Sequence, residues 1–261
     1  MLEQRREPRS FQTYPEVRHT PRGRLRAVAA RPPPRQNHLL AALPLQDYER
    51  LLPALEPVEL PLGQVVQGAG EQENYLYFLT AGIVCRYCNL ENGAVAAFTV
   101  SGKEGVIGIG TFLGGDSTLS QAVVVSTGSA YRLRAEVLHN EFKRGGPLQH
   151  SLLHYMLTLL TQTGQTAVCN RHHRLEQQLC RWILSCLDRV SANELTITQE
   201  LIANIMGVRR EGITEAEGRL QQAGIISCSR GHMTVLDRQQ LEARACECYL
   251  AVKKWTPAVG H

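Results

Sequence analysis

Hydrophobic residues change their spacing along this chain, and each change predicts a different kind of element. Within residues 37–57, leucines recur at helical intervals and Pro44 and Pro53 interrupt them, which predicts short helices. Within residues 58–138, short runs of β-branched and aromatic residues alternate with glycines, which predicts antiparallel strands in a sandwich or roll. These runs read QVVQGAG, YLYFLTAGIVCRY, AVAAFTV and QAVVVSTGSAYRL.

A long helix is predicted over residues 148–172, because apolar residues there recur alternately four and three apart. This stripe has two explanations: packing onto the β domain of the same chain, or a seam between two chains. Leu153, Met156 and Leu160 form a second apolar stripe, so one face can contact the β domain and the other a partner. We therefore predict a dimer whose interface contains Leu148, Leu152, Tyr155 and Leu159.

Two short helices joined by a glycine turn are predicted in TQELIANIMGVRREGITEAEGRLQQAGII, residues 198–226. Thr198 suits an N-cap, Gly207 ends the first helix and Gly224 ends the second, as in a helix-turn-helix. The short strands IISC and MTVL come next and predict a hairpin, the wing of a winged helix. Asp237 then caps a last helix, expected over residues 238–249.

The outward face of the second helix is charged, and its charges favour DNA binding. Arg209 and Arg210 stand at its N-terminus, where cations oppose the helix dipole, so helix stability does not explain them. Arginine can donate two hydrogen bonds to guanine, and glutamate can accept one from cytosine, in the major groove. A solvated charged face is the alternative explanation. We predict DNA contacts from Arg209, Arg210, Glu211, Thr214, Glu215 and Arg219, with Arg230 and His232 of the wing on phosphates.

Composition changes this picture mainly at the N-terminus. Hydrophobic residues make up 43% and charged residues 20%, as in ordinary globular proteins, and 261 residues suffice for two domains. Residues 1–36 carry nine arginines and three glutamates, which gives this segment a net charge of +6. The whole chain has a net charge of only +4, so the remaining residues are slightly acidic. We expect this proline-rich tail to be disordered, either as a solvated extension or as an arm on DNA phosphates.

Several kinds of site are not expected. The sequence has no apolar stretch long enough to span a membrane and no secretory signal, so we expect a cytoplasmic protein without membrane contact. Cys85 and Cys88 fall on opposite faces of a strand, and Cys246 and Cys248 on separate faces of a helix. The other four cysteines are isolated, so we predict reduced thiols and no metal site, with a redox or metal role as the alternative. No nucleophile elbow, phosphate loop or paired-histidine motif indicates an enzyme.

These segments resemble the Crp/Fnr family of bacterial regulators over about residues 37–255. The resemblance is strong in the helix-turn-helix segment and moderate in LPLGQVVQGAGEQENYLYFLTAGIV. It implies an α+β chain in four parts: a disordered basic tail at 1–36, an antiparallel, cyclic-nucleotide-binding-like sensory β-roll at 37–147, a dimerisation helix at 148–172 and a winged helix-turn-helix DNA-binding domain at 173–261. By position, the family's base contacts fall on Arg210, Glu211 and Glu215, and a phosphate contact falls on Thr198. The resemblance also implies a homodimer on a palindromic operator in double-stranded DNA, with RNA polymerase as a further partner.

Two stretches depart from the family pattern. Glu215 stands where the family usually has a basic residue, and Gly212 weakens its helix by about 1 kcal/mol relative to alanine, so the operator is expected to differ. Cyclic-nucleotide binders carry Gly-Glu and Arg-Ser/Thr-Ala, where this chain has Gly108-Ile109 and Ser120-Gln121-Ala122. A phosphate would lose charge-assisted hydrogen bonds there, so we expect an unknown effector other than cyclic AMP. The alternative is a ligand-binding or protein-interaction module whose DNA-binding domain has lost its activity.

No cofactor is expected either. The iron-sulfur members of the family carry a cysteine cluster near the N-terminus, whereas the first 84 residues here contain no cysteine. No histidine of the predicted roll is marked as a haem ligand by its surroundings.

Overall fold

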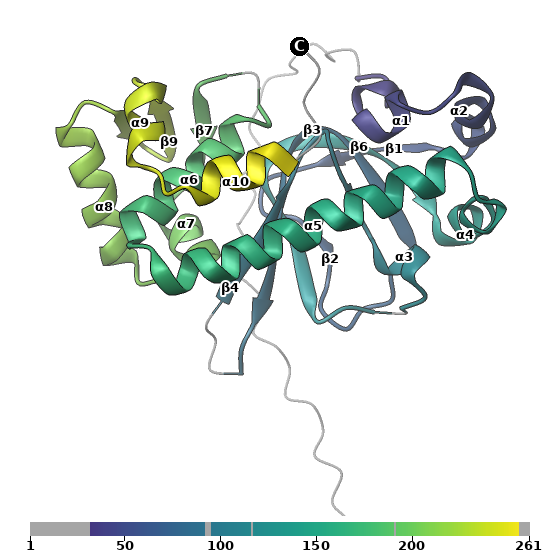
Figure 1. Ribbon diagram of the computed structural model, residues 1–261, viewed down its shortest axis with the longest axis horizontal. Coiled ribbons are helices and arrows are strands. Elements are labelled where there is room, and N and C mark those ends of the chain that lie inside the picture. The colour runs from purple at the N-terminus through teal and green to yellow at the C-terminus, as the bar shows by residue number, and fades with distance from the viewer. Residues whose placement is uncertain (1–31, 92–94, 116, 191, 256–261) are drawn as a thin grey trace, which may run out of the picture. The chain divides into compact units, whose positions relative to one another are not determined.

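Figure 1 shows the computed structural model, which describes residues 32–91, 95–115, 117–190 and 192–255. Most of the predicted disordered tail, residues 1–31, lies outside them. The end of that tail is ordered, contrary to the prediction, because Pro34–Gln36 forms a 3-10 turn (η1) against the first domain. Asn37 explains this order. Its side-chain amide donates to the carbonyls of Leu79 and Gly105, at 3.0 and 2.9 Å, and its oxygen caps the next helix.

The first domain is an antiparallel sheet with short helices, as the alternation of strands and glycines predicts. β3 (Tyr75–Asn89) and β6 (Ser120–Arg134) pair at its centre, and the strand order is β1-β6-β3-β4, with β2 on β6 and β5 on β3. Apolar side chains fill both faces of this pair, because successive residues of a strand point to opposite faces and both strands contain runs of consecutive buried residues. The other elements are α1 (His38–Ala41), α2 (Leu45–Leu51), η2 (Leu52–Ala54), β1 (Glu56–Leu60), β2 (Val65–Gln67), β4 (Val95–Ser101), β5 (Val106–Ile107), α3 (Gly110–Leu113) and α4 (Ala135–Arg144).

The long helix α5 (Pro147–His172) crosses the face of this domain in Figure 1 and covers its edge strand β4. Polar side chains of α5 bond the backbone of β4: Gln162 accepts from the Val100 amide at 3.4 Å, and Thr166 donates to the Phe98 carbonyl at 3.2 Å. An edge strand otherwise leaves its outer backbone groups unpaired. The buried stripe of α5, including the polar residues Gln162 and Thr166, therefore faces the β domain of the same chain.

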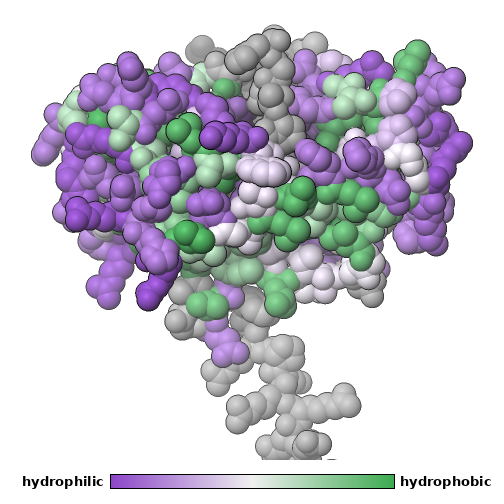
Figure 2. All heavy atoms as spheres, viewed as in Figure 1, coloured by the Kyte–Doolittle hydropathy of each residue, from purple (hydrophilic) through white to green (hydrophobic). Residues whose placement is uncertain are grey.

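The stripe predicted to form the dimer interface is consequently the wrong one. All four of its side chains are at most 4% exposed and belong to the core of their own chain (Leu148, Leu152, Tyr155 and Leu159). Tyr155 is also tied to the end of β4 by a 2.8 Å hydrogen bond between its hydroxyl and that of Ser101. The exposed apolar stripe lies on the other side of α5, where Leu153, Leu157, Leu160 and Val168 are 49–64% exposed. Figure 2 shows a run of hydrophobic surface along this helix.

The second domain holds the predicted helix-turn-helix and wing. Its elements are α6 (Leu175–Leu187), β7 (Glu194–Thr196), α7 (Gln199–Met206), α8 (Arg210–Gln222), β8 (Ile226–Ser229), β9 (His232–Val235), α9 (Arg238–Arg244) and α10 (Cys248–Trp255). The small sheet has the order β7-β9-β8, so the predicted hairpin gains a third strand that the sequence pattern did not show.

The last predicted helix, residues 238–249, is broken in two. Asp237 caps α9 as expected, accepting a hydrogen bond from the Gln240 amide at 2.9 Å. Ala245 then takes an extended conformation (φ −71°, ψ 156°), and α10 starts at Cys248. Cys246 and Cys248 therefore flank a bend, and their expected separation around one helix axis does not apply.

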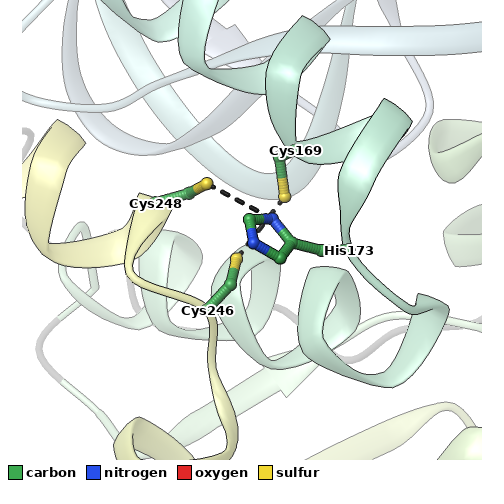
Figure 3. Close-up of side chains that lie close together, drawn as sticks. All are labelled: Cys169, His173, Cys246 and Cys248. Atoms are coloured by element: carbon green, nitrogen blue, oxygen red, sulfur yellow. Dashed lines mark hydrogen bonds between the residues drawn. The ribbon is translucent and has the colours of Figure 1, made fainter.

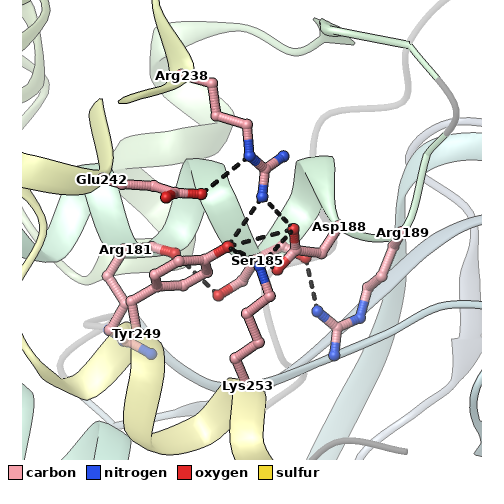
Figure 4. A network of polar contacts seen from close by, with 8 residues as sticks. All are labelled: Arg181, Ser185, Asp188, Arg189, Arg238, Glu242, Tyr249 and Lys253. Atoms are coloured by element: carbon pink, nitrogen blue, oxygen red, sulfur yellow. Dashed lines mark hydrogen bonds and ion pairs between the residues drawn. The ribbon is translucent and has the colours of Figure 1, made fainter. Parts of the chain in front are cut away.

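Ion pairs hold the second domain together (Figure 4), and a further ion pair joins it to the roll. Arg238 of α9 bonds Asp188 after α6, and the Tyr249 hydroxyl of α10 donates to the same carboxylate at 3.0 Å. Arg189 pairs with Glu104 of the roll at 2.6 Å, and both side chains are buried. Among the described residues, no helix combines the length and apolar character needed to cross a bilayer.

Candidate nucleic-acid interface

The two helices of the helix-turn-helix are fixed by their caps and by a buried clamp. Thr198 caps α7, accepting a hydrogen bond from the Leu201 amide at 3.2 Å. Gly207 ends α7 with φ +66°, and a Cβ there would lie 2.1 Å from the Val95 carbonyl oxygen, so the turn requires glycine. Gln199 of α7 donates to buried Glu217 of α8 at 2.6 Å. This buried hydrogen bond fixes the orientation of α8 relative to α7.

The N-terminus of α8 presents free charged side chains. Arg209 is the N-cap residue without a side-chain cap, and Arg210 and Glu211 form the first turn. All three side chains are exposed, and none of these side chains makes a hydrogen bond or ion pair with another described residue. Two cations at a helix N-terminus cost stability, so their retention favours an external anionic or polar partner. Side chains at this end of a helix are those that enter a major groove first.

Two predicted contact residues farther along α8 are instead paired within the chain. The Arg219 guanidinium bonds Glu215 at 2.6 Å and Glu176 of α6 at 2.6 Å. The Arg219 hydrogen bond lowers the pKa of Glu176, and Arg244 acts in the same direction. A base contact by Glu215 would have to compete with this pair. Thr214 is also engaged, donating to the Arg210 carbonyl and to Gln199.

The wing ends in a strained two-residue turn. Arg230 and Gly231 connect β8 to β9 with φ of +47° and +80°, the left-handed pair that a tight hairpin turn requires. Arginine is costly at such a position, and strain of this kind concentrates at functional sites. Arg230 is exposed at the tip, and His232 beside it lies 3.4 Å from the Thr196 hydroxyl.

The structure brings the three predicted contact regions together. The Gly231 carbonyl accepts a hydrogen bond from the Ile197 amide at 2.8 Å, so the wing tip lies beside the N-cap Thr198. The adjacent Gln199 links in turn to Thr214 of α8. All nine predicted DNA contacts are exposed along this line from wing to recognition helix (Thr198, Arg209, Arg210, Glu211, Thr214, Glu215, Arg219, Arg230 and His232).

The roll contains a polar residue that the sequence interpretation missed. Arg86 projects from β3 at 2% exposure, and its guanidinium lies 3.5 Å from the Ser120 hydroxyl. Its Nε and one terminal nitrogen have no hydrogen-bond partner among the described residues. Burial lowers the pKa of Arg86, and the nearby Glu73 carboxyl opposes this. In the sequence, the signal for this residue was a single arginine within an apolar strand. The Arg86 side chain supplies a cation next to Ser120, the position at which the cyclic-nucleotide binders of the family carry an arginine.

Comparison with known proteins places both domains. A model of the cyclic nucleotide-binding domain matches residues 57–144, and one of the Crp-like helix-turn-helix domain matches residues 177–244. The curated "Anaerobic regulatory protein" of Pasteurella multocida is 22% identical over 202 residues, which cover 74% of this chain and 72% of that protein.

Solved structures show the same fold. FixK2 from Bradyrhizobium japonicum superposes with a TM-score of 0.61 at 16% identity, covering 74% of this chain and 98% of that one. The c-di-GMP responsive global regulator CLP of Xanthomonas campestris gives 0.60 at 16% identity, covering 74% and 99%. A candidate Crp/Fnr regulator from Eubacterium rectale gives 0.64 at 19% identity, covering 79% and 96%. With a cyclic nucleotide-binding domain, a long helix and a Crp-like helix-turn-helix domain in that order, this chain is a DNA-binding transcription regulator of the Crp/Fnr type.

Proposed function

We propose that this chain is a cytoplasmic, homodimeric regulator that reads a palindromic operator with α8 and acts together with RNA polymerase. The observation that carries the proposal is the unpaired, exposed set Arg209, Arg210 and Glu211 at the N-terminus of α8. Arg210 and Glu211 contact bases, and Thr198, Arg209, Arg230 and His232 hold phosphates. Thr214, Glu215 and Arg219 contribute after their internal hydrogen bonds rearrange.

The dimer forms through the exposed stripe of α5. Leu153, Leu157, Leu160 and Val168 recur four, three and eight residues apart, which places them along one side of the helix. Solvent-exposed leucines in a continuous row are costly unless a partner covers them. A twofold interface on this helix would present both recognition helices to one DNA duplex, about one helical turn apart.

The effector is a ligand other than cyclic AMP. Ile109 has no group that could bind a ribose hydroxyl, whereas buried Arg86 beside Ser120 offers a positive charge from a different strand. An anionic ligand of another shape fits this arrangement better than a cyclic nucleotide. Titration calorimetry with cyclic AMP should show no heat of binding at micromolar concentrations, and a micromolar dissociation constant would contradict the proposal.

A pair of arginine variants tests DNA reading. Arg210→Ala should weaken binding by about 1–3 kcal/mol per half-site and relax preference at one base pair, because a bidentate guanine contact is worth about that much. Arg230→Ala should weaken all sequences alike and flatten the salt dependence, since a phosphate contact releases counterions without reading sequence. Arg144→Ala, an exposed arginine of the roll, is the matched control.

Binding selections from the parent genome followed by gel shifts provide the measurement. The assignment of helix and wing is wrong if Arg210→Ala keeps its sequence preference while Arg230→Ala changes it. If the wild-type dimer binds no genomic fragment, a module that has lost DNA binding becomes the better explanation, and the Glu215–Arg219 pair favours that candidate.

A further inference from the structure

Three thiols and one imidazole converge where sequence spacing predicted isolated cysteines (Figure 3). Cys169 and His173 come from the end of α5, and Cys246 and Cys248 come from the bend between α9 and α10. Their ligand atoms all lie within 4.8 Å of one another. We propose that these four side chains bind one thiophilic divalent cation of the Zn²⁺ class in a tetrahedral site.

The spacing of the ligand atoms suits a single ion. The sulfurs of Cys169 and Cys246 are 3.5 Å apart, as are the Cys248 sulfur and Nδ1 of His173. Tetrahedral ligands at ordinary zinc–sulfur and zinc–nitrogen bond lengths stand about 3.5–3.8 Å from one another. Cys169 and His173 are four residues apart, so they share one face of the helix end. Small side-chain adjustments would therefore complete the coordination.

A second layer of contacts orients the ligands. Nδ1 of His173 faces Cys248, while Nε2 on the other side of the ring lies 3.3 Å from the Glu247 carboxylate. Histidines that bind metals commonly donate their second nitrogen to a carboxylate in this way. The Gln165 side-chain amide donates to the Cys248 sulfur at 3.0 Å, which helps to hold this sulfur in place.

Burial and charge also fit a bound cation. The three cysteines are at most 4% exposed, whereas the His173 side chain keeps 15% of its surface exposed and leaves a route for the ion. Three thiolates around a divalent ion carry a net negative charge. The Arg181 guanidinium interacts electrostatically with Cys169 and would offset part of that charge.

Other chemistry explains the cluster less well. A disulfide between Cys169 and Cys246 would use two of the four groups, and their sulfurs are separated by more than the roughly 2 Å of a disulfide bond. Iron-sulfur clusters are ordinarily held by four thiolates on several irons, and this cluster has three thiols around a space of single-ion size. Soft sulfur ligands with one imidazole select zinc among the common divalent ions.

The site has a mechanical consequence because it joins two parts of the chain. Two of its ligands end the long helix α5, and the other two follow the wing and α9. A bound ion would hold the last two helices against α5 and would stabilise the folded state by mass action. This inference does not depend on DNA binding, since metal content measures it directly.

The test uses the full-length protein, purified in reductant and stripped with a chelator. After equilibration with Zn²⁺, elemental analysis should find one zinc per chain, and Co²⁺ should give the strong visible bands of a tetrahedral thiolate complex. The double variant Cys246→Ser/Cys248→Ser should lose both signals. Cys228→Ser, a partly buried wing thiol outside the cluster, should keep them.

Glu247→Gln provides a variant that preserves the fold, because this side chain is 79% exposed. It should weaken Zn²⁺ binding about tenfold, the lower end of effects seen for carboxylates behind a ligating histidine. The proposal fails if reduced, folded wild-type protein takes up no Zn²⁺, or if the double cysteine variant binds as well as wild type. Iron with acid-labile sulfide, or a Cys169–Cys246 disulfide formed in the presence of Zn²⁺, would also overturn it.

Discussion

At the scale of single residues, the second domain keeps two side chains at positions that reduce stability. Arg230 occupies a left-handed turn position, and Glu217 is a carboxyl buried in the recognition helix. Glu217 has a structural use because it binds Gln199 and fixes α8 against α7. Within the described chain, Arg230 makes no hydrogen bond that would offset its strain. Its retention is therefore best explained by an external partner.

Arg230→Asn should raise the free energy of unfolding by about 1 kcal/mol, because asparagine tolerates the left-handed conformation of this turn better than arginine. The same variant should weaken DNA binding, since the phosphate contact is lost. Urea unfolding gives the first quantity and gel shifts the second. Ser229→Asn, one residue earlier in β8, should bring no gain in stability. Equal stability of Arg230→Asn and wild type would show that the turn is not strained.

Glu217 should make stability depend on pH. Burial raises the pKa of this carboxyl, and the Gln199 hydrogen bond only partly opposes the shift. An acid whose folded-state pKa is raised destabilises the protein above that pKa, and this cost vanishes below the unfolded-state value. Glu217→Gln should therefore stabilise the protein at pH 7 and have no effect below a pH of about 4. Thermal unfolding across pH tests this, with exposed Glu194→Gln as the control, and a gain independent of pH would contradict it.

At the scale of elements, sequence patterns predicted what local chemistry determines. Thr198, Gly207 and Asp237 cap or end helices through their own side chain or backbone, so these boundaries were found correctly. The bend at Ala245 was not found, because nothing in its local sequence opposes a helix there and packing against α5 and α6 decides it. The cysteine cluster was missed for the same reason.

Local sequence pattern also cannot decide which of the two apolar stripes of α5 faces the roll. Both stripes are apolar, and the one that faces the roll is distinguished by Gln162 and Thr166, whose partners are backbone groups of β4. From the sequence alone, these two residues are only polar interruptions of an apolar stripe, because their partners lie on a strand far away in the sequence. The DNA contacts predicted on α8 rest on exposed charge at a helix N-terminus, which has few structural explanations. The internal pairing of Glu215 and Arg219 could not be predicted in this way, because it depends on Glu176 of a different helix.

Leu157→Glu should convert the proposed dimer to monomer at micromolar concentration. Each chain would lose a buried leucine worth about 1.5 kcal/mol or more at the interface, which for two chains is about a hundredfold in the dissociation constant. Light scattering and sedimentation measure this. Leu119→Glu, at an 88% exposed leucine of the roll, is the matched control and should remain dimeric. An unchanged dimer in Leu157→Glu would exclude this stripe as the interface.

At the scale of the whole molecule, the roll and the DNA-binding domain share a buried ion pair. Glu104 follows β4 in the roll and Arg189 follows α6, and at 2% and 6% side-chain exposure neither is well solvated. Glu104 also accepts hydrogen bonds from the Gly102 amide at 3.1 and 3.2 Å, so the loop that carries it is folded around its carboxylate. The pair is thus a fixed connection between the domain expected to bind an effector and the domain expected to read DNA.

Removing one member of this pair should be far more damaging than removing a surface pair. Arg189→Met would leave the Glu104 carboxylate buried without its cation, which costs about 3–5 kcal/mol. Arg50→Met breaks a surface cluster with Asp47 and Glu141 and should cost far less. The double variant Glu104→Gln/Arg189→Met removes both charges and should recover most of the loss. Urea unfolding of wild type, Arg189→Met, Glu104→Gln and the double variant gives the coupling energy directly. If the double variant were as unstable as the sum of its single changes, the two side chains would act independently, and the connection between the domains would have to lie elsewhere.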